Sequence, residues 1–220
     1  PNNKSVAVAA INGPRTVVIS GARDEVNEVL HELGTSGIAL EVSHAFHSPL
    51  MLPAAGAFRE VVESVQFGPL KVPLASTVTG KVVEVGSWFG DDHWVKQLSY
   101  PVLFMDALEA CLTTCLEVES REEKASTSIL EIGPNPILSR LSLQWVKERI
   151  GGRLEWLSSI DTRSSGTELD HVNEIASKLE RTPSLPNGLC KPHNAFPNRT
   201  SFPWKRFEAA EATSMQHGIE

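Results

Sequence analysis

The chain has 220 residues, and its 20 Lys and Arg against 27 Asp and Glu give a formal net charge of −7. With 41% hydrophobic and 21% charged residues, its composition is ordinary for a globular chain that buries a core. No cluster of Lys and Arg occurs, so we expect neither a nucleic acid nor a membrane surface as a partner. No apolar run approaches the roughly 20 residues of a membrane-spanning helix.

The first part of the chain predicts the order strand, strand, helix, strand. Apolar runs at 6–11 and 16–21 flank an Asn-Gly-Pro turn signal, and residues 22–34 have helical spacing that ends at Gly34. A third strand is predicted at 37–43. This order is most of a ferredoxin-like unit, one strand and one helix short. Because the chain also begins with Pro rather than Met, we expect it to be a piece of a longer protein.

Helices and strands then alternate up to about residue 160. Helical spacing predicts helices at 52–65, 91–98, 101–118 and 135–150. Extended runs predict strands at 72–85 with a break at Thr79-Gly80, at 128–133 and at 154–160. This alternation favours an α/β core that is built partly of parallel strands.

The sequence changes character from about Asp161. A linker-like stretch and one modest helix at 171–180 precede a segment rich in Pro, Asn and aromatic residues. Such a segment cannot make its own core, so we expect it to lie extended across another surface. The last dozen residues are predicted to be disordered.

Cysteine usage indicates a reducing compartment. The chain has three cysteines and no CxxC pair, which argues against both a disulfide framework and a zinc site. Cys111 and Cys115 lie four residues apart in a predicted helix, and burial as small apolar side chains explains them best. We therefore expect a cytoplasmic protein.

The densest polar cluster within an apolar stretch is the run from Ser43 to Ser48, directly after a predicted strand. Its two histidines, His44 and His47, could be metal ligands, but the other histidines show no spacing that supplies a third ligand. Either could instead be a hydrogen-bonded loop residue, or a general base that takes a proton from a hydroxyl nucleophile. Composition alone does not separate these three interpretations.

The run VSHAFHSPLM at 42–51 resembles the active-site histidine segment of the acyltransferase domains of polyketide synthases, a family related to bacterial malonyl-CoA:acyl carrier protein transacylases. Four further runs resemble the same family in the same order: AAINGPRTVVISG (9–21), PLASTVTGKVV (73–83), HWVKQLSYPVLFMDAL (93–108) and LEIGPNPILSRL (130–141). The resemblance covers residues 6 to about 160. The tail NAFPNRTSFPWKRFE more loosely resembles the linker that follows such domains.

The resemblance implies an α/β fold in which a partial ferredoxin-like small subdomain, residues 5–43, is inserted in a larger one. The larger one is an incomplete α/β-hydrolase-like (malonyl transacylase) subdomain, residues 44–160. An extended post-acyltransferase linker at 161–207 and a disordered tail at 208–220 are expected to follow.

The resemblance also implies the site residues. His47, the last residue of the HAFH tetrad, matches the family's catalytic base, and the backbone carbonyl of Gln97 matches the group that orients it. His44 and Phe46 belong to the same HAFH tetrad. In the family, members that choose malonyl-CoA usually carry HAFH at this place, whereas members that choose methylmalonyl-CoA tend to carry YASH. A bulky Phe46 would fill the space of an α-methyl group. One methyl group in a pocket changes the free energy of discrimination between two substrates by about 1–3 kcal/mol. Asn12 lies in a turn that the family places near the cleft, and an ordinary turn Asn is the alternative.

The acylated serine of the family lies in a GHSxG turn, and no GxSxG occurs in this chain. The arginine that clamps the malonyl carboxylate has no match either, since Arg15, Arg23 and Arg59 lie outside its motif. We therefore expect the isolated chain to be inactive.

In a complete domain, the resemblance implies transfer of malonyl from malonyl-CoA, through an acyl-serine, to the phosphopantetheine thiol of an acyl carrier protein. A ketosynthase domain of the same polypeptide is the expected neighbour, and neither a metal nor a bound cofactor is expected. A non-catalytic scaffold or truncated fragment, and the equivalent part of a fatty-acid synthase, are the alternatives.

Overall fold

The computed structural model describes residues 5–119, 127–150, 154–161, 173–178 and 212–218. They belong to two compact units. The first comprises 1–116, 140–151 and 209–220, and the second comprises 117–139 and 152–208. Helices and small sheets occur in the chain together, so the predicted α/β class is confirmed.

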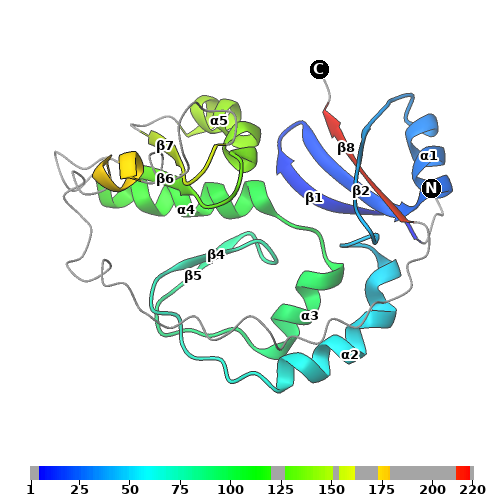
Figure 1. Cartoon of the computed structure of the whole chain (residues 1–220), viewed down its shortest axis with the longest axis horizontal. Helices are drawn as coiled ribbons and strands as arrows, with labels where there is room; N and C mark the ends of the chain where they lie inside the picture. Colours follow the sequence, from blue (N-terminus) through cyan, green and yellow to red (C-terminus); the bar gives the residue numbers. More distant parts are fainter. Residues whose placement is uncertain (1–4, 120–126, 151–153, 162–172, 179–211, 219–220) are drawn as a thin grey trace. The chain divides into compact units, whose positions relative to one another are not determined.

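The first unit contains a four-stranded antiparallel sheet (Figure 1). Its strands are β1 (Ala7–Gly13), β2 (Thr16–Ala22), β3 (Ile38–Leu40) and β8 (Ala212–Gly218). The order across the sheet is β1-β2-β8-β3, so the segment 212–218 lies between β2 and β3. β1 and β2 form the hairpin that the Asn-Gly-Pro signal predicts.

Helix α1 (Arg23–Glu32) packs on β2 and β8 of this sheet. It buries Val26 and Leu30, which are four residues apart and therefore lie on one face of the helix. Gly34 follows with a φ of 63°, a left-handed conformation that glycine adopts at little cost and that commonly ends a helix. The predicted helix and its stop are confirmed.

Two expectations for this sheet were wrong. The third strand was predicted over 37–43, but β3 has only three residues because it pairs with β8 at Ile38, Ala39 and Leu40 alone. Residues 208–220 were expected to be disordered, but 212–218 form β8 and pair with β2 along its whole length. Periodicity over so short a segment cannot indicate a pairing with strands far away in the sequence.

The first unit continues with helices and a small hairpin. Its elements are the short 3-10 helix η1 (Pro49–Met51), α2 (Leu52–Glu63), β4 (Leu74–Ser76), β5 (Lys81–Val83), α3 (Asp91–Ser99) and α4 (Phe104–Glu119), which extends beyond the unit at its end. Gly80, with a φ of 67°, makes the tight turn between β4 and β5 where the sequence predicts a break. Helices α2 and α3 pack against each other and against η1.

The start of α4 differs from its prediction. Pro101 was expected to open this helix, but the helix begins only at Phe104. Between them Val102 is extended: its N–H donates to the Ala9 carbonyl at 2.8 Å, and its carbonyl accepts from the Ile11 N–H at 2.9 Å. The segment after Pro101 is therefore tied to the free edge of β1.

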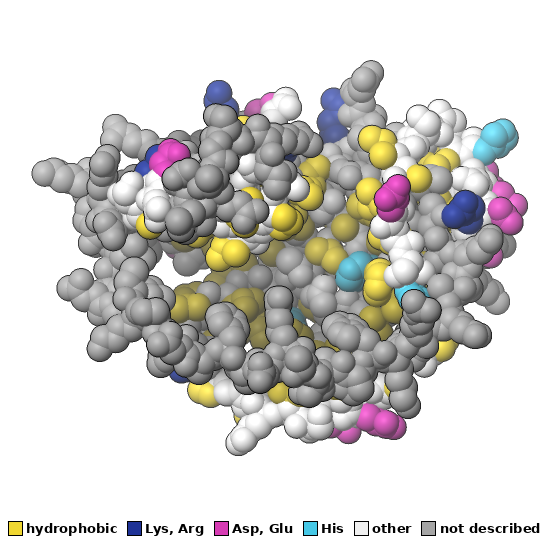
Figure 2. Space-filling view, viewed as in Figure 1, with side chains coloured by type: hydrophobic (Ala, Val, Ile, Leu, Met, Phe, Trp, Pro, Cys, Tyr) yellow, Lys and Arg dark blue, Asp and Glu magenta, His cyan; other side chains and the backbone are white. Residues whose placement is uncertain are grey.

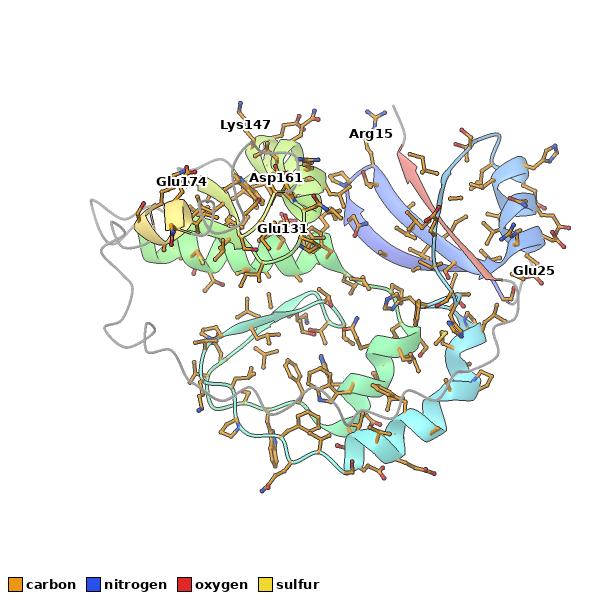
Figure 3. The ribbon with its side chains drawn as sticks, in the orientation of Figure 1. Arg15, Glu25, Glu131, Lys147, Asp161 and Glu174 are labelled. Atoms are coloured by element: carbon orange, nitrogen blue, oxygen red, sulfur yellow. The ribbon has the colours of Figure 1, made fainter. Side chains whose placement is uncertain are left out.

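The second unit contains β6 (Thr127–Glu131) and β7 (Leu154–Ser158), which pair in parallel as the alternation of elements predicts. Glu131, labelled in Figure 3, lies at the end of β6 and caps the first turn of α5 (Ile137–Arg149). Its carboxylate accepts hydrogen bonds from the backbone N–H groups of Ile137, Leu138 and Ser139 at 2.8–3.0 Å. Partial burial acts to raise the pKa of Glu131, but the bonds from Ser139 and these N–H groups outweigh it and lower that pKa.

Large hydrophobic side chains remain exposed in both units. Ile132 is 83% exposed, Ile38 73% and Trp88 68%. Figure 2 accordingly shows hydrophobic side chains at the visible surface of the described parts. Within those parts, no helix combines the length and the apolar character needed to cross a bilayer.

Candidate active site

His47 lies in the loop between β3 and η1, within a turn that its neighbours hold in place. Ser48 is fully buried, and its hydroxyl donates to the Ala45 carbonyl at 2.6 Å while accepting from the Leu50 N–H at 3.3 Å. Ala45 is buried as well. The polar run that stands out in the sequence is therefore a packed turn rather than a loose loop.

The backbone of His47 is in the left-handed region, with a φ of 60°. Among the described residues, it is the only non-glycine residue with a positive φ. Such a conformation costs of order 1–3 kcal/mol and persists where the surroundings enforce it, often at functional sites. Here the His47 N–H donates to the Leu98 carbonyl, at 3.1 Å, near the end of α3.

The imidazole of His47 is oriented by a second carbonyl from the same region. Its Nδ1 lies 3.0 Å from the Tyr100 carbonyl oxygen. A carbonyl oxygen only accepts, so Nδ1 must carry the proton of the neutral ring. Nε2 then holds the lone pair. The arrangement is that of a base whose tautomer is fixed by a backbone acceptor instead of a carboxylate.

The Tyr100 carbonyl is available because the helix ends there. The Tyr100 N–H makes the last bond of α3, to the Lys96 carbonyl at 2.8 Å, and Pro101 follows. A residue before proline is pushed out of the helical region, and Tyr100 is indeed extended with φ −92° and ψ 157°. Since Val102 is held by β1, the carbonyl of Tyr100 is fixed from both sides.

Burial lowers the pKa of His47, and the backbone hydrogen bonds of Tyr100 and Gln97, which act to raise it, compensate only in part. A lowered pKa keeps the imidazole neutral, and thus able to accept a proton, near pH 7. The carbonyls at the end of α3 also carry partial negative charge, which would favour the imidazolium once it forms.

Gln97, the predicted orienting residue, lies in the last turn of α3. Its carbonyl influences the pKa of His47 less than that of Tyr100, and its side chain accepts a hydrogen bond from the Thr77 hydroxyl at 3.3 Å. The role of Gln97 stays a prediction. The 3.0 Å bond to Tyr100 was missed, although the sequence Tyr100-Pro101 at a helix end could have indicated it.

The other predicted site residues are His44, Phe46 and Asn12. His44 and Phe46 flank the turn with ring centroids 5.8 Å apart, and Phe46 is 40% exposed. Nδ1 of His44 lies 2.9 Å from the Ser43 hydroxyl, while its buried Nε2 has no partner among the described residues. Asn12 lies in β1, and no hydrogen bond in the described part of the chain joins it to His47.

No ion pair in the described part of the chain involves His47. Arg59 pairs with Asp92 at 2.6 Å on the exposed surface of α2 and α3. Arg15 extends from the turn between β1 and β2 (Figure 3). Groups of three or more His, Cys, Asp or Glu that could hold a metal ion are absent from the described residues.

Comparisons with known proteins give one family. The family model described as "Acyl transferase domain" matches residues 2–153. Polyketide synthase GfsB of Streptomyces halstedii is 36% identical over 151 residues, which are 67% of this chain and 2% of that protein. The non-reducing polyketide synthase terA of Aspergillus terreus is 35% identical over 162 residues, which are 72% of this chain and 7% of that protein.

Solved structures agree with this result. The acyltransferase domain from the second module of the salinomycin polyketide synthase matches with a TM-score of 0.65 and 30% identity, over 83% of this chain and 40% of that one. The malonyl CoA-acyl carrier protein transacylase from Clostridium perfringens, at 24% identity and a TM-score of 0.59, shares the fold over 81% of this chain and 52% of that one. The chain thus spans about half or less of the solved domains it matches.

Proposed function

The chain belongs to the family of acyltransferase domains found in polyketide synthases and in malonyl-CoA:acyl carrier protein transacylases, and from this premise we propose that it supplies the general base of the acyl transfer. The base is His47, and the observation that carries the proposal is the 3.0 Å approach of its Nδ1 to the Tyr100 carbonyl. This bond fixes the proton on Nδ1 and leaves Nε2 to receive another.

The chemistry is a double exchange at one carbonyl carbon. Nε2 of His47 takes the proton of a serine hydroxyl while its oxygen attacks the thioester of malonyl-CoA, and the C–S bond then breaks. The imidazolium returns the proton to the departing thiolate of coenzyme A. In the second half, His47 takes the proton of the phosphopantetheine thiol of an acyl carrier protein while the thiol sulfur attacks the ester carbonyl of the acyl-serine. The ester C–O bond then breaks, and the imidazolium returns the proton to the serine oxygen. Neither half consumes a redox equivalent.

The nucleophilic serine comes, in this proposal, from residues outside the sequence. No GxSxG occurs among the 220 residues, and the chain spans 40% of the salinomycin acyltransferase structure. Exposed hydrophobic side chains such as Ile132, at 83%, are consistent with apolar surfaces that further residues cover.

The division of the chain follows from the same proposal. Residues 5–43 belong to the small subdomain and 44–160 to the large one. The expected linker at 161–207 lies, apart from residue 161 and residues 173–178, outside the residues that the structure describes. The partners are malonyl-CoA, an acyl carrier protein, and a ketosynthase domain of the same polypeptide.

The experiment that tests the function uses a complete acyltransferase domain carrying this chain, with transfer from malonyl-CoA to a carrier protein followed across pH. The base works only when neutral, and burial lowers the pKa of His47 below the 6.5 of a free imidazole. We therefore expect kcat/KM to fall on the acid side with a midpoint below pH 6.5. Circular dichroism over the same range would separate this titration from unfolding. A midpoint above 6.5 in a folded enzyme would contradict the assignment.

Selectivity for malonyl should depend on Phe46. We expect Phe46→Ser to raise the ratio of methylmalonyl to malonyl transfer by about 10-fold, because the smaller side chain leaves room for a methyl group. Competition between the two CoA esters measures the ratio directly. Phe58→Ser is the matched control, since Phe58 lies on α2 and is 38% exposed against 40% for Phe46. An unchanged or lower ratio in the Phe46 variant would remove this residue from substrate selection.

Pro101 should act on the base through the carbonyl of Tyr100. We expect Pro101→Ala to lower kcat by about 10-fold, because alanine allows Tyr100 to return to a helical conformation that turns its carbonyl away from His47. KM for malonyl-CoA should change little. The control is Pro73→Ala at an exposed loop position. A rise in KM with kcat intact would instead indicate a contact with substrate.

A further inference from the structure

Both main-chain carbonyls that hold His47 lie in one short segment, residues 97–103. The Leu98 carbonyl accepts the backbone N–H of His47 at 3.1 Å, and the Tyr100 carbonyl lies 3.0 Å from its Nδ1. The segment runs from the last turn of α3 to the residue before α4. Because a carbonyl moves with its backbone, the position of the base depends on the contacts that fix this segment.

Thr77, in the turn between β4 and β5, contacts both ends of the segment. Its hydroxyl donates to Oε1 of Gln97 at 3.3 Å, and its carbonyl accepts the backbone N–H of Leu103 at 2.7 Å. All of these residues belong to the first unit. One residue therefore links the two ends of the stretch that carries both acceptors of His47.

The turn that supplies these contacts is itself held in place. Ser76 is buried, and its hydroxyl accepts from the backbone N–H groups of Val78 and Thr79 at 3.2 and 3.4 Å. Its carbonyl accepts from the Gly80 N–H at 2.8 Å. The turn also lies tightly against α4, since a Cβ at Gly80 would come 2.8 Å from the Cβ of Asp106. Local bonds and close packing thus make this turn a firm support.

We propose that Thr77 is a positioning residue for the catalytic base: its hydroxyl holds the last turn of α3, so that the two carbonyls keep His47 in place. The inference rests on the proposed function, because it takes His47 to be the base. The side chain is the specific part. Any residue at position 77 would supply the carbonyl, but only a side-chain donor supplies the bond to Gln97.

Steady-state transfer by a complete acyltransferase domain that carries this chain tests the role of the hydroxyl. Thr77→Val, which replaces the hydroxyl with a methyl group, should lower kcat by about 5-fold and leave KM for malonyl-CoA nearly unchanged. Thr77→Ser retains the hydroxyl and should keep the normal rate. The matched control is Thr79→Val, because Thr79 is an exposed residue of the same turn. A normal rate in Thr77→Val, or an equal loss in the serine variant or the control, would overturn the proposal.

The partner of the hydroxyl provides a second test, which also serves if Thr77→Val does not fold. Gln97→Met removes the acceptor and keeps an unbranched side chain, so it should lower kcat to the same extent. The double variant should be no slower than either single one, because both substitutions remove the same bond. Losses that multiply in the double variant would show that the two side chains act independently, and would overturn the proposal.

The position of the imidazole proton gives a readout that a merely structural role would not move. In a domain labelled at the histidine nitrogens, nuclear magnetic resonance should find the neutral ring of His47 protonated on Nδ1, which lies 3.0 Å from the Tyr100 carbonyl. Thr77→Val should raise the fraction protonated on Nε2, and Thr79→Val should not. A lower kcat with an unchanged tautomer would mean that Thr77 does not act through His47, and would overturn the inference.

The two proposals fail in different ways. Normal transfer after His47→Ala would overturn the proposed function. Loss of transfer in that variant, together with a normal rate and a normal tautomer in Thr77→Val, would overturn the role of Thr77 alone.

Discussion

Replacing His47 with alanine, in a complete acyltransferase domain that carries this chain, should lower transfer of malonyl to a carrier protein by about 10²–10⁴-fold. The variant loses the Nε2 lone pair that takes the serine proton, while the binding surface for the thioester is otherwise retained. Most of the loss should therefore fall on kcat. Single-turnover acylation and steady-state transfer, measured separately, would show both half-reactions affected, because the same imidazole serves each.

The control for this variant is His31→Ala, which removes an exposed imidazole from α1 and should leave the rate within about two-fold. Folding of the His47 variant needs its own check, because His47 has a φ of 60° and alanine tolerates this backbone conformation less well than glycine. His47→Gly avoids this strain and should be as inactive. Retention of normal transfer in either variant would exclude His47 as the base.

The isolated chain should form no acyl-enzyme with malonyl-CoA, because its sequence contains no GxSxG turn. Intact-mass spectrometry after incubation would detect a malonyl adduct as a discrete mass increase. Co-expression with the upstream half of an acyltransferase domain, which carries the serine, should restore both the adduct and the transfer.

The matched control is an upstream half whose nucleophilic serine is replaced by alanine. It should assemble with the chain in the same way yet give no adduct. A malonyl adduct on the isolated chain would contradict the assignment of the nucleophile to other residues. Stable assembly without any transfer would favour a non-catalytic scaffold instead.

Much of the fold could be predicted because its elements leave local signals. The spacing of Val26 and Leu30 indicates α1, Gly34 ends it, and Gly80 marks the turn between β4 and β5. Each of these features depends on residues a few positions apart, and local periodicity and turn chemistry report such features well.

What could not be predicted depends on contacts between distant segments. β3 is limited to three residues by its partner β8, which begins at Ala212, so no window around 37–43 contains the reason. The start of α4 is delayed because Val102 pairs with β1, about 90 residues earlier in the sequence. Local propensity is overridden in both places by backbone pairing.

The candidate site, too, could be predicted only in part. His47 could be singled out from the polar run around it, because side-chain chemistry is visible in a sequence. Its 3.0 Å acceptor, the carbonyl of Tyr100, is a group that every residue possesses, so only the geometry of the helix end and of Pro101 distinguishes it.

The use of a main-chain acceptor has a consequence for mutational surveys of this enzyme class. Substitution at position 100 changes the phenol but always leaves the oxygen that faces the imidazole at 3.0 Å. An alanine scan would consequently detect one half of this dyad and overlook the other. Replacing the amide that follows Tyr100 by an ester, through semisynthesis, would weaken that oxygen as an acceptor and so expose the contribution that genetic substitution conceals.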